Sequence, residues 1–113
     1  MCEKNQLELI LAEMVKYSEI IFKEKLETII LFGSYARGDY DDESDIDIMI
    51  LADIKPEEVN YYSDSLIDCI YETALENDCV ISHCVIPLSV FEQYKNVLPF
   101  YKNILKEGIR IGT

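Results

Sequence analysis

The sequence has few basic residues and no long hydrophobic run, and both shortages exclude classes of function. It contains 10 lysine and arginine residues against 22 aspartate and glutamate residues, which gives a formal net charge of −12. A chain of this charge repels phosphate backbones, and its basic residues are scattered, so direct binding of nucleic acid is not expected. The longest apolar runs, such as residues 29–32 and 48–52, fall far short of the roughly 20 residues that span a bilayer.

The N-terminal residues 1–4, Met-Cys-Glu-Lys, lack the apolar stretch of a signal peptide. We therefore predict a cytoplasmic protein with no membrane segment, whose four cysteines are reduced thiols. A chain of 113 residues can bury enough surface for one hydrophobic core but not for two. The length predicts a single domain over residues 1–113.

Histidine occurs once, at position 83, between Cys79 and Cys84. Zinc ligands typically lie about two to four residues apart within a turn. These three residues instead lie in a β-branched run, in which neighbours point to opposite faces of a sheet. The pattern favours ordinary strand residues over a zinc site.

The spacing of apolar residues predicts an α/β domain in which a small mixed β-sheet is flanked by helices. Apolar residues recur at helical spacing over residues 5–23 and 59–76. Short β-branched or alternating runs at residues 28–32, 45–51 and 79–86 predict three strands.

Local signals predict how the remaining elements begin and end. Ser89 and Glu92 have the spacing of a capping box, which predicts a helix that begins at Ser89. Pro99 predicts the start of a further helix, and Gly108 suits the left-handed residue that ends one. Residues 109–111 then predict a short edge strand.

Three polar features follow one another closely in the sequence. Gly33 and Ser34 come directly after a predicted buried strand, Arg37 follows one short turn later, and Asp45 and Asp47 begin the next strand. Glycine lets the backbone approach an anion closely, and serine offers a hydroxyl and an amide at a helix N-terminus. Two carboxylates two residues apart on a strand project to the same side and can share Mg²⁺. The pattern predicts a phosphate cradle beside a metal platform, with room for a triphosphate between them.

These residues resemble the signature of the minimal nucleotidyltransferases, small members of the DNA polymerase β nucleotidyltransferase superfamily. The match consists of residues 31–38, Leu-Phe-Gly-Ser-Tyr-Ala-Arg-Gly, and residues 44–48, Ser-Asp-Ile-Asp-Ile. Ten residues separate Ser34 from Asp45, which is the spacing of the family pattern. The resemblance covers about residues 29–51 and implies a polymerase β-like nucleotidyltransferase fold.

The resemblance implies transfer of AMP from ATP to an acceptor hydroxyl with release of pyrophosphate. By matching position, Gly33 and Ser34 would hold the β- and γ-phosphates. Asp45 and Asp47 would be the catalytic carboxylates and would bind Mg²⁺ at the α-phosphate. Arg37 matches the family's arginine and would bind phosphate.

Two points of the sequence leave this chemistry open. Arg37 could equally form a surface salt bridge with Asp39 or Asp41. The family often carries a third carboxylate on the later strand, where residues 82–84 of this sequence are Ser-His-Cys. The histidine could act as a base, and Asp78 could replace the acid only with a shifted strand register.

Three functions therefore stay open. The resemblance implies an antitoxin that adenylylates a hydroxyl, typically of tyrosine, on a helical HEPN-type RNA-cleaving toxin. The alternative is a module of the same fold that binds nucleotide and neutralises its partner by contact. Aminoglycoside-type nucleotidyltransfer is a weaker alternative, because such relatives usually carry an additional helical domain. An acidic surface suits a basic protein and a cationic drug alike, and the sequence leaves homo-oligomer formation open.

Overall fold

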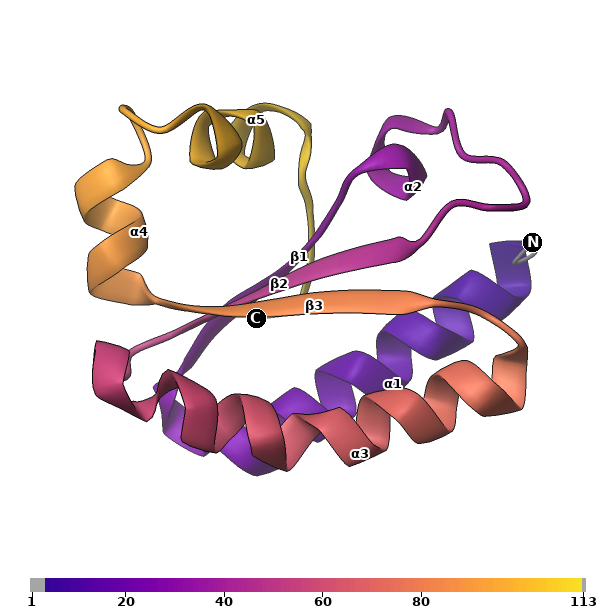
Figure 1. Cartoon of the computed structure of the whole chain (residues 1–113), viewed down its shortest axis with the longest axis horizontal. Helices are drawn as coiled ribbons and strands as arrows, with labels where there is room; N and C mark the ends of the chain where they lie inside the picture. The colour runs from indigo at the N-terminus through magenta and orange to yellow at the C-terminus, as the bar shows by residue number, and fades with distance from the viewer. Residues whose placement is uncertain (1–3, 113) are drawn as a thin grey trace.

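The computed structural model describes residues 4–112, which form a four-stranded mixed sheet with helices on both faces (Figure 1). The strands are β1 (Leu26–Phe32), β2 (Ile46–Ala52), β3 (Ile81–Pro87) and β4 (Ile109–Gly112). The helices are α1 (Lys4–Phe22), α2 (Ser34–Arg37), α3 (Val59–Asn77), α4 (Leu88–Tyr94) and α5 (Pro99–Glu107), with 3-10 turns at Lys23–Lys25 and Pro56–Glu58. The strand order is β3-β2-β1-β4; β2 is antiparallel to β1 and parallel to β3, and β4 is antiparallel to β1. This confirms the predicted mixed sheet flanked by helices.

Strand β2 explains why the sheet has two apolar faces and where its polar residues lie. Ile46, Ile48 and Ile50 are fully buried in the cluster that packs against α1 and α3. Met49 alternates with them and packs in a second cluster against α4 and α5. Figure 1 shows α1 and α3 together on one side of the sheet and α4 and α5 on the other. Because side chains alternate along a strand, Asp47 lies on the α4/α5 face.

Two predicted helix ends are wrong, because the neighbouring strands determine the backbone there. Helix α4 begins at Leu88 with Pro87 as its N-cap and no side-chain capping bond, since the chain enters this helix directly from β3. Glu92 instead forms an ion pair with Lys95 at 2.6 Å. Gly108 has φ −70° and ψ 149°, so it is not left-handed; strand β4 follows at once and requires extended backbone.

The cysteines differ from expectation at one position. Within residues 4–112, Cys69 and Cys84 are free thiols, but Cys79 is disulfide-bonded. The prediction that all thiols are reduced is therefore wrong for Cys79, and Cys2 lies outside the described residues. Over the same range, no group of three or more histidine, cysteine or acidic side chains is arranged to hold a metal. None of the helices within residues 4–112 combines the length and the hydrophobicity that a membrane span requires.

Candidate active site

The chain reverses sharply between β1 and α2, and Gly33 makes this junction. Gly33 has φ 76° and ψ −156°, a combination that only glycine adopts readily. Its carbonyl accepts hydrogen bonds from the amides of Ala36 and Arg37, both at 3.1 Å, so the short helix α2 begins immediately and has Ser34 as its first residue. A Cβ atom on Gly33 would collide with the carboxylate of Asp47. Glycine is therefore needed here both for the turn and for close approach to β2.

The two carboxylates of the motif lie at the beginning of β2, beside this turn. In the register of the sheet, Asp47 lies opposite Phe32 of β1 and Ser82 of β3. Asp45 lies just before β2, and its Oδ2 atom accepts a hydrogen bond from the Ser82 hydroxyl at 3.3 Å. Both carboxylates are half-buried. The structure thus brings Gly33, Asp45 and Asp47 together.

The electrostatics of the pair favour a bound cation. Burial raises the pKa of Asp47, the nearby charge of Asp45 raises it further, and Arg37 partly opposes both effects. Two carboxylates and the Ser82 hydroxyl offer only hard oxygen atoms, which are the ligands that Mg²⁺ prefers. The donor set therefore fits Mg²⁺, with Asp45 and Asp47 as the residues that would hold it.

Arg37 lies at the end of α2 and is exposed. Its Nε atom donates to Asp39 Oδ2 at 3.2 Å, and its Nη1 atom lies 3.5 Å from Glu107 Oε2. The hydrogen bond and the charge of Asp39 raise the pKa of Arg37. The sequence left open a salt bridge from Arg37 to Asp39 or to Asp41, and the one to Asp39 forms. The Asp41 carboxylate instead accepts a hydrogen bond from the backbone amide of Glu43 at 2.9 Å. An incoming phosphate would have to compete with Asp39 and Glu107 for this guanidinium.

A small cavity lies next to Gly33, between β1 and α5. It has a volume of about 190 Å³ and is lined by Phe32, Gly33, Arg37, Phe100, Asn103, Ile104 and Glu107. The rings of Phe32 and Phe100 meet edge to face, with centroids 5.6 Å apart. The aromatic wall can accept part of a nucleotide whose phosphates lie at Gly33, while the rim carries both charges because Arg37 is ion-paired with Glu107 there. The sequence motif gave no signal for the α5 residues, which join the site only through the fold.

Strand β3 shows which residues occupy the neighbourhood of a third carboxylate. Ser82 bonds to Asp45, and Cys84 packs against the cluster on the α4/α5 face. Burial raises the pKa of Cys84 to about 11, with Asp47 as a smaller cause. His83 points to the other face, where its Nε2 atom lies 3.2 Å from the hydroxyl of Ser63. His83 therefore cannot act as a base for chemistry at Asp45 and Asp47.

Asp78 does not supply the third acid either. It caps the C-terminal end of α3 in a left-handed conformation with φ 52°. The β2–β3 register pairs Asp47 with Ser82, so the shifted register that Asp78 would need does not occur. The site contains two carboxylates and the Ser82 hydroxyl.

Known proteins resemble this chain over most of its length. The family model described as a nucleotidyltransferase domain matches residues 11–111. A Methanocaldococcus jannaschii protein, provisionally named a protein adenylyltransferase, is 38% identical over 96 residues, which cover 85% of this chain and 88% of that protein. A second protein of the same organism and the same provisional activity is 55% identical over 47 residues, or 42% of this chain and 48% of that one.

Solved structures share the fold at lower identity. A crystal structure of a toxin–antitoxin with AMP-PNP has a TM-score of 0.56 at 20% identity and covers 91% of this chain and 73% of its own. A Shewanella oneidensis complex of an AMPylated HEPN toxin with an MNT antitoxin has a TM-score of 0.51 at 20% identity and covers 94% and 72%. These likenesses confirm the predicted fold, and with the family match over residues 11–111 they establish that the chain belongs to the nucleotidyltransferase domain family.

Proposed function

We propose that this chain is a Mg²⁺-dependent protein adenylyltransferase that transfers AMP from ATP to a tyrosine hydroxyl of a helical HEPN-type toxin and thereby acts as its antitoxin. The observation that carries the proposal is the packing of Gly33 directly against Asp47. This contact joins the turn after β1 and the carboxylate pair of β2 in one site. The provisional names of the M. jannaschii relatives and the complexes among the structural neighbours support a protein acceptor.

The site divides the work of the reaction among a few residues. The backbone at Gly33 and the hydroxyl and amide of Ser34 bind the β- and γ-phosphates, and Arg37 adds a cation at the rim. The acceptor oxygen bonds to the α-phosphorus, the bond from that phosphorus to the oxygen bridging to the β-phosphate breaks, and pyrophosphate leaves with the electron pair. The hydroxyl proton passes to solvent. Mg²⁺, when bound by Asp45 and Asp47, supplies positive charge beside the α-phosphate.

The charge of the chain explains why a divalent cation is needed. The protein carries a formal net charge of −12, and ATP is a polyanion. Asp45 and Asp47 would repel its triphosphate at close range unless a cation lies between them. Because Arg37 is already paired with two carboxylates, this side chain alone does not reverse the local charge. Binding of ATP should accordingly depend on Mg²⁺.

The test purifies the product of the gene adjacent to this one, which the proposal expects to be a HEPN-type protein, and measures transfer of labelled AMP to it from ATP with and without Mg²⁺. The parent should label this partner, and Asp45→Asn should not. Asp53→Asn is the matched control, because Asp53 is an exposed aspartate just past the other end of β2. Absence of label transfer by the parent, or undiminished transfer by Asp45→Asn, would contradict the proposal.

One observation favours a second candidate function, neutralisation of the partner by contact alone. Ser82 and Cys84 occupy the β3 positions that face the carboxylate pair, and neither provides a carboxylate to hold a second cation or accept a proton. In this case the parent would inhibit RNA cleavage by the HEPN-type protein without labelling it. Inhibition by Asp45→Asn equal to that by the parent would support this second function.

A further inference from the structure

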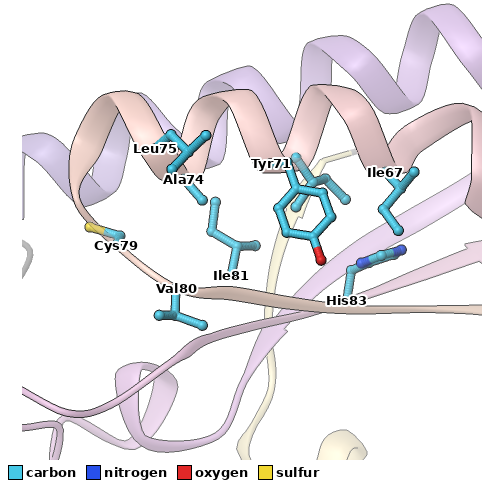
Figure 2. A pocket seen from close by; sticks show the side chains of 9 residues that line it. Ile67, Tyr71, Ala74, Leu75, Cys79, Val80, Ile81 and His83 are labelled. Atoms are coloured by element: carbon cyan, nitrogen blue, oxygen red, sulfur yellow. The ribbon is translucent and has the colours of Figure 1, made fainter.

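The surface of the molecule has an apolar groove between α3 and β3. The groove has a volume of about 340 Å³, and its lining includes Ile67, Tyr71 and Leu75 of α3 and Val80, Ile81 and His83 at the beginning of β3. Figure 2 shows these side chains along the gap between the helix and the strand. This groove is larger than the cavity beside Gly33.

The helical wall of the groove is a ridge that no other element within residues 4–112 covers. Ile67, Tyr71 and Leu75 are four residues apart, so their side chains form one row along α3. They are 37%, 64% and 81% exposed, respectively. None of them belongs to either core cluster. A row of this spacing has the form that packs into the groove of another helix.

The rim of the groove is negatively charged. Asp64, Asp68 and Glu72 follow the same helix beside the ridge, and Asp78 lies at the turn into β3; all four are exposed. None of them forms an ion pair with another residue of the range 4–112. The sequence contains no lysine or arginine between residues 55 and 95. A ligand of this groove therefore needs an apolar centre and positive flanks.

We propose that the α3–β3 groove binds an amphipathic helix of a partner protein, in which lysine and arginine residues flank an apolar stripe. The inference rests on the proposed function in taking the helical HEPN-type toxin as that partner. A second copy of this chain is a poor occupant, because dimerisation through the groove would bring two acidic rims together in molecules that each carry a net charge of −12.

The groove and the carboxylate pair lie on opposite faces of the sheet. Ile81 and His83 face α3, whereas Ser82 bonds to Asp45 on the other face. A helix in the groove leaves the face with Asp47 open to ATP. Partner binding and ATP binding are thus separable, so a groove variant should lose the first and keep the second.

The test measures, by calorimetry, binding of the purified product of the adjacent gene, the expected HEPN-type partner. Leu75→Arg and Tyr71→Arg place a cation where a basic helix would dock, and each should weaken binding by about tenfold or more. Leu9→Arg is the matched control, since Leu9 is 68% exposed but lies on α1. Binding to Leu9→Arg should equal binding to the parent, and Mg·ATP affinity should be the same in all four proteins.

A second arm tests the charged rim. Asp68→Asn combined with Glu72→Gln should weaken partner binding and reduce its dependence on salt. Parent-like affinity in Leu75→Arg and Tyr71→Arg, or failure of the parent to bind the partner, would overturn the inference. Loss of binding in the two arginine variants while the parent transfers no AMP would support the groove and contradict only the adenylyltransferase activity.

Discussion

Replacing Gly33 by alanine should damage both the fold and the site, and the two losses can be measured separately. The φ of 76° and ψ of −156° at Gly33 lie in a region essentially limited to glycine. Any other residue in this conformation lowers the stability of the protein by about 1–3 kcal/mol. The new methyl group would also collide with the Asp47 carboxylate, which must move. If that movement removes one charge-assisted contact worth about 1.5–3 kcal/mol, the affinity for Mg·ATP falls about ten- to a hundredfold.

Gly38→Ala provides the matched control. Gly38 also has a positive φ, 87°, but an added Cβ atom would meet nothing within 4 Å. Alanine there should cost about 1–2 kcal/mol of stability and leave Mg·ATP binding unchanged. Urea denaturation gives the free energy of unfolding, and calorimetry gives the affinity. Equal Mg·ATP affinity in Gly33→Ala and Gly38→Ala would refute the argument that Gly33 is required for the approach of Asp47.

Three further outcomes are expected. Ser34→Ala should weaken Mg·ATP binding by about 1 kcal/mol in calorimetry, because it removes the hydroxyl and keeps the amide. Burial, and then the charge of Asp45, raise the folded-state pKa of Asp47 above its ordinary 3.8. The folded state therefore holds the proton to higher pH than the unfolded state does, and the stability of the parent falls as pH rises from the unfolded pKa to the folded one. Asp47→Asn should remove that fall in urea denaturation at a series of pH values, while Mg·ATP binding is lost. Ser82→Asp should speed labelled AMP transfer, whereas Cys84→Asp should mainly lower the free energy of unfolding.

The sequence predicted that Gly33 and the two aspartates of the candidate site would lie together, because local patterns determine their placement. The apolar run of β1 stops at Gly33, and the alternation of Ile46 and Ile48 with Asp47 fixes the faces of β2 before any long-range contact is known. Burial of the isoleucines then leaves Asp47 on the opposite face. These are short-range signals, and the structure agrees with each of them.

Contacts between distant segments could not be predicted in the same way. The ion pair from Arg37 to Glu107 and the contact of Phe32 with Phe100 depend on the packing of α5 over the sheet. The orientation of His83 depends on the register of β3 against β2, two strands that the α3 crossover connects. No pattern within one segment encodes such a register, so the sequence left open whether position 82 or position 84 faces Asp45 and Asp47 and whether His83 acts as a base.

The structure now distinguishes the two β3 positions at which a third carboxylate could act. Ser82 is exposed, lies opposite Asp47 in the strand register, and donates a hydrogen bond to Asp45. An aspartate at position 82 would therefore lie beside both carboxylates and stay hydrated. Cys84 lies deeper, where burial already raises the pKa of its thiol to about 11. A carboxylate at position 84 would lose hydration next to the charge of Asp47, which opposes folding. Only Ser82→Asp should therefore transfer labelled AMP faster than the parent, and a larger gain from Cys84→Asp would show that the acceptor approaches from the buried side of Asp47.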